Sequence, residues 1–193
     1  IKDAQLRHST GAAGRKKIVA EYSIAASAEK FISLFSKSNC MCGISGAFAL
    51  TQKGKDSLQH IEKANEALLK RGPDGGAVFK AGHVGLGHRR LSIIDTSCAG
   101  DQPMTTPDRR YTIIFNGEIF NFHQLRSRFF KDQELQQLRS HSDTEIFLLL
   151  YSKLGIKAFE LLEGFFAAGI YGADREGLVL VRDRKGKKPL LGY

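Results

Sequence analysis

From residue 42 onward, the hydrophobic positions of the chain follow two alternating spacings. Short apolar runs bounded by Gly, Pro or Asp predict strands, and apolar residues repeated every three or four positions predict helices. Strands cluster toward both ends of this region with helices between them, which favours a layered α+β architecture. The predicted strands are 43–50, 77–80, 84–94, 111–115, 165–171 and 178–182, the last two joined as a hairpin around 172–177, and the predicted helices are 56–70, 122–131, 143–154 and 156–162.

The first forty residues differ in character from the rest. Apolar residues between positions 16 and 35 follow a helical period, and Ser23 offers an N-cap for the second of two short helices. We therefore expect a helical extension over 1–40 and no catalytic residue before Cys42.

The charge of the chain is concentrated at its two ends. With 193 residues, 42% of them hydrophobic, the sequence is typical of one globular domain. The net charge of +9 would favour nucleic-acid binding if it were spread over one face. However, residues 1–40 carry seven basic and three acidic residues, and the tail from Arg182 carries five basic and one acidic. The region between them is almost neutral, so we expect no nucleic-acid partner.

Cysteine content and hydropathy indicate the cellular setting. Cys40, Cys42 and Cys98 are too few for a disulfide framework, and none has the spacing of a metal site. No apolar run reaches the 18 or more residues of a membrane span, and the polar opening residues do not resemble a signal peptide. We expect a protein of the reducing cytoplasm, with no bound metal and no membrane association.

Met41 and Cys42, followed by small residues, read like the beginning of a protein. If translation starts at Met41 and this residue is removed, Cys42 carries a thiol and a free α-amine on adjacent atoms, and one residue holds both a nucleophile and its base. If the chain is used as printed, the amine is part of a peptide bond and Cys42 is an ordinary cysteine. The sequence leaves both alternatives open.

Two further segments place polar groups beside predicted strands and helices. Arg71-Gly72-Pro73-Asp74 is expected to end a helix, with Gly72 in the C-terminal capping position and a rigid turn after it. Arg89 and Arg90 precede a strongly apolar stretch, where a guanidinium group can hold a carboxylate through two parallel hydrogen bonds or remain solvated.

A strand end and a helix start supply further polar groups. Asn116-Gly117-Glu118 is predicted to be a turn that ends the strand 111–115. It offers an amide donor, an approachable backbone N–H and a carboxylate, although Asn-Gly is also a common hairpin turn. Ser142-Asp143-Thr144-Glu145 opens a helix with Ser142 or Asp143 as its cap, and one of its carboxylates can face a pocket.

Taken together and in this order, these segments resemble the glutaminase domain of glutamine-hydrolysing asparagine synthetase, a class II glutamine amidotransferase. The resemblance implies an N-terminal nucleophile (Ntn) hydrolase fold, a four-layer αββα sandwich that is here truncated at its C-terminus. The matching segments span 41–193 and are Met41–Ile44, Arg71–Asp74, Arg90–Asp95, Gln102–Met104, Asn116–Asn121, Ser142–Glu145, Gly164–Ala167 and Arg182–Leu190.

The resemblance also implies a reaction, the hydrolysis of L-glutamine to glutamate and ammonia. Cys42 would attack the side-chain amide carbon after its thiol loses a proton to its own α-amine, and a thioester would form. The Asn116 side chain and the Gly117 backbone N–H would make up the oxyanion hole.

The same resemblance implies how the substrate is held. Arg90 would bind the α-carboxylate of glutamine, while Glu118 and Asp143 would receive its α-ammonium group. The residues that would line the pocket are Leu91, Ile93 and Ile94.

Partners and domain boundaries follow from the same comparison. The family continues into a synthetase domain with a Ser-Gly-Gly-x-Asp-Ser pyrophosphate loop, which this sequence lacks, so ATP and Mg²⁺ would act there and no cofactor is expected on this chain. We expect a second polypeptide or domain to receive the ammonia, and a homodimer is a further expectation. Residues 1–40 resemble the closing segment of glycosyltransferases with two Rossmann domains, and we interpret them as read-through sequence or a propeptide preceding an incomplete amidotransferase domain at 41–193.

Two alternatives to an active glutaminase stay open. The domain could be a catalytically inactive fragment whose Cys42 is blocked by the extension. A conventional Cys–His hydrolase is the other alternative, and its base would be His88, His123 or His141.

Overall fold

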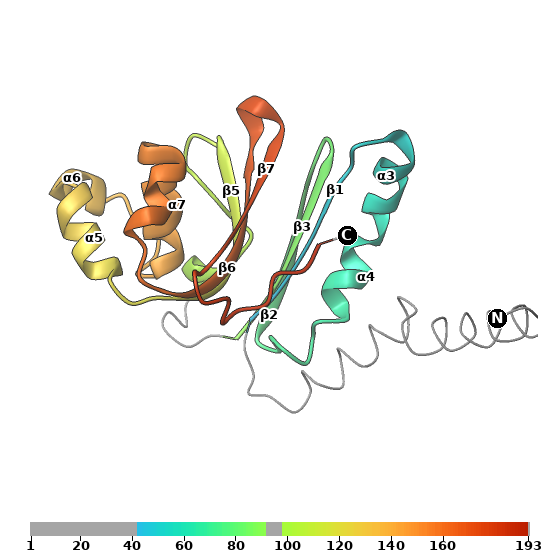
Figure 1. Ribbon diagram of the computed structural model, residues 1–193, viewed down its shortest axis with the longest axis horizontal. Helices are drawn as coiled ribbons and strands as arrows, with labels where there is room; N and C mark the ends of the chain where they lie inside the picture. Colours follow the sequence, from blue (N-terminus) through green and yellow to red (C-terminus); the bar gives the residue numbers. More distant parts are fainter. Residues whose placement is uncertain (1–41, 92–97, 193) are drawn as a thin grey trace, which may run out of the picture. The chain divides into compact units, whose positions relative to one another are not determined.

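The computed structural model describes residues 42–91 and 98–192, which belong to the compact unit Cys40–Tyr193. Two antiparallel sheets lie between two groups of helices, with α3 and α4 beside one sheet and α5, α6 and α7 beside the other (Figure 1). This arrangement agrees with the predicted α+β class. The expected helical extension over 1–40 lies outside the described residues.

The first sheet has three strands in the order β1-β3-β2: β1 (Gly43–Phe48), β2 (Gly75–Ala81) and β3 (Val84–Arg90). Between β1 and β2 the chain forms α3 (Gln52–Ser57), a 3₁₀ turn (Leu58–His60) and α4 (Ile61–Glu66). Helix α4 contacts all three strands. Gly85 of β3 has no side chain, so the Ile61 side chain packs directly on the strand, and a Cβ at Gly85 would lie 3.3 Å from it.

The second sheet has four strands in the order β4-β5-β6-β7: β4 (Met104–Thr105), β5 (Tyr111–Ile119), β6 (Gly164–Gly172) and β7 (Gly177–Arg182). Its helices are α5 (Phe122–Phe129), α6 (Asp132–Leu135) and α7 (Asp143–Leu154), and α7 contacts β5. Three 3₁₀ segments complete the described elements: Cys98–Gly100, Gly155–Leu161 and Ala173–Arg175.

Two hydrophobic cores hold these layers. The larger core lies between the second sheet and its helices and is centred on Phe147, whose ring meets the rings of Phe115 and Phe166 at 5.9 and 5.8 Å. The smaller core lies between the sheets. It joins residues of β1, β2, β3, β5, β6 and β7, namely Ile44, Phe48, Phe79, Ala81, Val84, Leu86, Ile114, Tyr171 and Leu178.

Strand alternation then decides which side chains face the space between the sheets. Because side chains two residues apart share a face, Cys42 lies on the same face as Ile44, and Arg90 on the same face as Leu86. On β5, Asn116 likewise shares the inner face of Ile114, whereas Phe115 faces α7. Side chains from both sheets are therefore directed toward one inter-sheet layer.

Most predicted elements are present, with different ends. The strands predicted near 43, 77, 165 and 178 and the helices 122–131 and 143–154 are confirmed to within a few residues. The single helix predicted for 56–70 is wrong, because helical structure begins at Gln52, after the capping residue Thr51, and changes to a 3₁₀ turn at Leu58–His60. The segment predicted as helix 156–162 is a 3₁₀ helix, and β4 and α6 were not predicted. The predicted end of strand 84–94 lies outside the described residues.

Two turn predictions are wrong. Asn116-Gly117-Glu118 is not a turn but part of β5, paired with β6 as far as Ile119↔Gly164. A Cβ at Gly117 would collide with the backbone of Phe165, so this glycine is needed for close packing of two strands. Gly72 is not a left-handed helix cap, since α4 ends at Glu66; it lies against the Arg89 backbone, where a Cβ has no space.

Candidate active site

Cys42 immediately precedes β1, and its thiol lies against the end of β3. The Leu91 backbone N–H donates to Sγ at 3.3 Å, and the thiol donates to the Leu91 carbonyl at 3.5 Å. The register Gly43↔Arg89 places the thiol here, because it aligns the residue before β1 with the residues that follow Arg89. Gly43 contributes by lacking a side chain, since a Cβ would lie 3.0 Å from Leu68.

The half-buried thiol experiences opposing electrostatic effects. Burial raises the pKa of Cys42, and the Leu91 backbone hydrogen bond and the charges of Arg90 and Lys188 oppose this rise. Arg71 also interacts with the thiol. Burial lowers the pKa of Arg71, and the charge of Cys42 opposes this decrease. Three cationic side chains therefore act on one sulfur, which favours the thiolate form.

Arg90 is buried and forms a salt bridge with Asp101, Nη1 to Oδ1 at 2.6 Å. The carboxylate of Asp101 is 57% exposed, so the pair lies at the boundary between the inter-sheet layer and solvent. An Arg90 that binds a carboxylate was predicted from the sequence, although here the carboxylate belongs to the protein itself. That Arg90 holds a substrate carboxylate stays a prediction.

The segment Asn116–Glu118 is held in an extended conformation by side chains from other elements. The buried Gln102 accepts the Phe115 N–H at 2.6 Å and donates to Thr144 Oγ1 at 3.3 Å. Two residues further along from Gly117, the Ile119 N–H donates to Asp143 Oδ2 at 2.8 Å. Gln102 and Asp143 thereby fix both ends of the predicted oxyanion-hole segment.

The sheet pairing also determines where the Gly117 N–H points. Phe166, the register partner of Gly117, uses its N–H and carbonyl for Asp183, on the β7 side. Gly117 and Phe166 therefore form a non-hydrogen-bonded pair, and the Gly117 N–H points away from β6. It points to the same edge as the N–H groups of Phe115 and Ile119 and lies between them.

Asp143 is a buried carboxylate at the start of α7. The helix is capped by Ser142, whose hydroxyl accepts the Glu145 N–H at 3.3 Å, which decides between the two predicted caps. Burial raises the pKa of Asp143 to about 6, the backbone hydrogen bond from Ile119 opposes the rise, and the like charge of Glu118 adds to it. Asp143 and Glu118 are thus two carboxylates within electrostatic reach of each other. That they receive the α-ammonium group of a substrate stays a prediction.

The structure brings most of the predicted site residues into two connected groups. Cys42, Arg90 and Leu91 lie together at the ends of β1 and β3. Glu118 and Asp143 lie together at the ends of β5 and α7, and Lys188 interacts electrostatically with both Cys42 and Glu118. Asn116 and Gly117 belong to the same strand as Glu118, while Ile93 and Ile94 lie outside the described residues.

Sequence reasoning missed four residues of this region: Arg71, Asp101, Gln102 and Lys188. Arg71 and Gln102 belong to segments that carried the resemblance, but only the tertiary packing gives them a contact with the site. Asp101 had no signal beyond its proximity to Arg90 in sequence. Lys188 was counted in the basic tail and in the matching segment Arg182–Leu190, but it was given no role at the site.

The predicted histidine bases find no support at the thiol. Within the described residues, the hydrogen-bond partner of the Cys42 thiol is backbone, not imidazole. His88 is buried, and burial lowers its pKa to about 4, so it is neutral near pH 7. Across residues 42–91 and 98–192 there is also no group of three or more His, Cys, Asp or Glu side chains arranged to hold a metal ion. A search of the same residues finds no helix with the length and hydropathy needed to cross a membrane.

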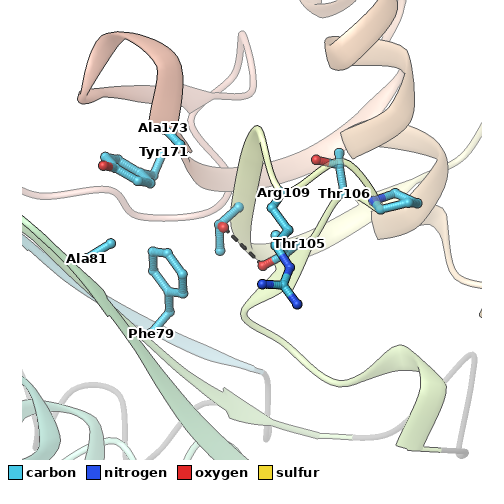
Figure 2. Close-up of a pocket in the computed structure, with 9 residues that line it drawn as sticks. Phe79, Ala81, Thr105, Thr106, Arg109, Tyr171 and Ala173 are labelled. Atoms are coloured by element: carbon cyan, nitrogen blue, oxygen red, sulfur yellow. Dashed lines mark hydrogen bonds between the residues drawn. The ribbon is translucent and has the colours of Figure 1, made fainter.

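A cavity of about 560 Å³ lies at the other end of the inter-sheet layer. It is lined by Phe79, Tyr171, Arg109 and the hydrogen-bonded pair Thr105–Thr112 (Figure 2). Phe79 pairs with Leu86 in register, whereas the residue after Cys42 pairs with Arg89. The cavity is therefore separate from the Cys42 group and does not contain the predicted catalytic residues.

Comparison with known proteins finds one matching family and several similar relatives. The family described as "Glutamine amidotransferase domain" matches residues 41–193. Asparagine synthetase [glutamine-hydrolyzing] 1 of Bacillus subtilis is 39% identical over 153 residues, which cover 78% of this chain and 24% of the relative. Asparagine synthetase B of Escherichia coli is 30% identical over 154 residues, covering 79% and 27%, and amidase chyE of Penicillium rubens is 33% identical over 162 residues, covering 78% and 23%.

The chain spans about a quarter of the length of these curated relatives. The family match begins at Met41, next to the thiol that the structure places against Leu91, and it includes every predicted site residue. The chain therefore belongs to the glutamine amidotransferase domain family.

Proposed function

We propose that residues 41–193 hydrolyse L-glutamine to glutamate and ammonia through a thioester on Cys42, once Cys42 is the amino-terminal residue. The observation that carries this proposal is the Cys42 thiol at the end of the inter-sheet layer, hydrogen-bonded to Leu91 and acted on by the charges of Arg90 and Lys188. The resulting assignment of the fold is the four-layer Ntn hydrolase sandwich.

The chemistry needs one proton acceptor and one oxyanion site. The α-amine of Cys42, with an ordinary pKa of about 7.7–8.0, takes the thiol proton, and the sulfur attacks the amide carbon of glutamine. The developing oxyanion accepts hydrogen bonds from the Asn116 side chain and the Gly117 N–H. The amine then passes its proton to the leaving nitrogen, ammonia departs, and water cleaves the thioester to release glutamate and restore the thiol.

Two features support the oxyanion assignment. Asn116 shares the inner face of β5, and the Gly117 N–H is directed away from the β6 ladder, so neither group is committed to a role inside the sheet. Loss of one oxyanion donor typically lowers kcat by about a hundredfold to a thousandfold.

The substrate would be held at its α-carboxylate by Arg90 and at its α-ammonium by Glu118 and Asp143. Arg90 already binds a carboxylate, and the paired carboxylates already favour a cation between them. Leu91, Ile93 and Ile94 complete the pocket in this proposal. The ammonia would serve ATP-dependent asparagine synthesis in a further domain that uses ATP and Mg²⁺, and a cytoplasmic homodimer is the proposed setting.

A direct test compares two forms of the chain. Expressed from Met41, with removal of that residue verified by intact mass, the protein should release glutamate from glutamine, whereas its Cys42→Ala variant should release none above background. Equal glutamate release by the two would refute the proposal.

A catalytically inactive domain is the second candidate. It is favoured by one observation, that in the printed chain Met41 occupies the nitrogen of Cys42 in a peptide bond. If the intact mass of the protein isolated from its host shows that residues 1–41 are still attached, the catalytically inactive domain is supported. A mass that begins at Cys42 would support the glutaminase.

A further inference from the structure

Asp183 organises the segment that follows β7. Its Oδ1 accepts the N–H groups of Lys185 and Lys187 at 3.0 and 3.1 Å. Its Oδ2 accepts the N–H groups of Lys188 and Phe166, both at 3.2 Å. Burial opposes ionisation of this carboxylate, but the four backbone donors hold the pKa of Asp183 below its usual range, so the carboxylate is charged and the turn is fixed.

This turn places Lys188 beside the site. Since Asp183 Oδ2 binds both Lys188 and Phe166, the Lys188 backbone lies next to β6 at the position where Phe166 pairs with Gly117. Through Phe166, the turn therefore holds the basic tail next to β5, the strand that contains the predicted oxyanion-hole residues.

The Lys188 ammonium belongs to a cluster of charged and titratable groups. Burial and the charge of Arg71 lower the pKa of Lys188, while Cys42, Glu118 and Asp183 oppose this decrease. Its neighbour Lys187 differs, because the Lys187 side chain is exposed and its Nζ lies 5.6 Å from the Phe165 ring centroid. Of these two lysines, Lys188 is the one whose backbone the Asp183 turn holds next to Phe166 and whose charge acts on Cys42 and Glu118.

We propose that Lys188 is a positioning residue of the Cys42 site, whose ammonium group stabilises the Cys42 thiolate and the negative charge of Glu118. Its importance for catalysis rests on the proposed glutaminase function, but its effect on the sulfur does not. In a chain that begins at Cys42, the same positive charge favours the neutral α-amine, which is the form that can accept the thiol proton.

The test measures the pH dependence of Cys42 alkylation by iodoacetamide, since the thiolate is the reactive form. The full chain is used, with Cys40 and Cys98 replaced by serine so that Cys42 is the remaining thiol. Lys188→Met should move the midpoint upward by about half a pH unit, less than the one to three units typical of an adjacent opposite charge. The shift should shrink in 1 M NaCl, where the screening length is about 3 Å.

Two further variants separate charge from shape. Lys187→Met, which removes the neighbouring charge, should leave the midpoint unchanged, and Lys188→Arg, which keeps the charge, should stay within about 0.2 unit of the parent. If Lys188→Met unfolds, Lys188→Gln replaces it in the same measurement.

Any of three results would overturn the proposal. The midpoint of Lys188→Met could equal that of the parent, Lys187→Met could shift the midpoint as much as Lys188→Met does, or Lys188→Arg could shift it as much as Lys188→Met does. Alkylation of Cys42 requires no turnover of glutamine. An absence of glutaminase activity would therefore refute the proposed function, while the alkylation experiment would still test the role of Lys188.

Discussion

Replacement of Asp143 by asparagine should stabilise the folded domain at neutral pH. Asp143 is 4% exposed, and burial raises the pKa of its carboxyl group to about 6, whereas an unfolded aspartate has a pKa of about 3.9. Asparagine keeps an oxygen that can accept the Ile119 N–H and removes the ionisable group. The substitution therefore isolates the free energy that the native structure loses when it keeps Asp143 charged.

The sign of this effect follows from proton linkage. Near pH 5 the folded protein holds the Asp143 proton more tightly than the unfolded chain, so the free energy of unfolding decreases as the pH rises through the interval from about 4 to 6. A difference of about two pKa units corresponds to about 3 kcal/mol when the pH is well above 6. Asp143→Asn should thus match the wild type near pH 4 and be more stable by up to about 3 kcal/mol near pH 8.

Urea denaturation at intervals between pH 4 and 8 gives the required free energies of unfolding. In a Glu118→Gln background the advantage of Asp143→Asn should be smaller, because the like charge that raises the pKa of Asp143 is gone. Asp108→Asn serves as a control of opposite sign, since the Thr106 hydroxyl lowers the pKa of that surface carboxylate. A difference between Asp143→Asn and wild type that does not change with pH, or a less stable variant at pH 8, would refute the reasoning.

Two further substitutions test the packing of the site. Gly117→Ala should lower the free energy of unfolding by about 3 kcal/mol or more, because the new Cβ meets the Phe165 backbone and lies 2.6 Å from Phe166 Cα. Gly177→Ala is the control, since its new Cβ would have its nearest neighbour at 3.8 Å. Equal losses of stability in the two variants would contradict the argument. Gln102→Ala should lower the free energy of unfolding by about 2–3 kcal/mol, because it leaves the Phe115 N–H without its acceptor. The control Gln124→Ala, at an exposed position, should lower it by less than about 0.5 kcal/mol. Urea titration measures both values, and a Gln102 variant as stable as the control would contradict this role.

Local sequence signals identified α7 and the β6–β7 hairpin well. The Ser142 hydroxyl caps α7 by accepting the N–H of Glu145, three residues later in the sequence. Strands β6 and β7 are also close in sequence and pair with each other. The interactions that form both elements therefore join residues near one another in the sequence. The Asn116–Gly117 pair misled for a related reason. Glycine suits both a tight turn and a close approach of two strands, and only the position of Phe165 on another strand distinguishes them.

Candidate site residues could be named from the sequence where their side chains are chemically distinctive, but not where their role depends on strand register. Cys42 and the pair Arg89–Arg90 could be singled out as candidates from residue type, and the family resemblance selected Arg90. Lys188 and Gln102 could not, because Lys188 is placed by the Asp183 turn and Gln102 by a hydrogen bond to the middle of β5. Their roles require knowledge of which segments lie side by side.

Gly117 and Cys42 differ in what their survival in a sequence would mean. Gly117 is required by strand packing, so a related domain that did not act on glutamine would still need glycine at that position. The Cys42 sulfur exchanges hydrogen bonds with the Leu91 backbone, and serine and alanine are no larger than cysteine. Under the proposed function, the residue at position 42 would separate active from decayed copies among related domains, whereas the glycine at position 117 reports only that the fold persists.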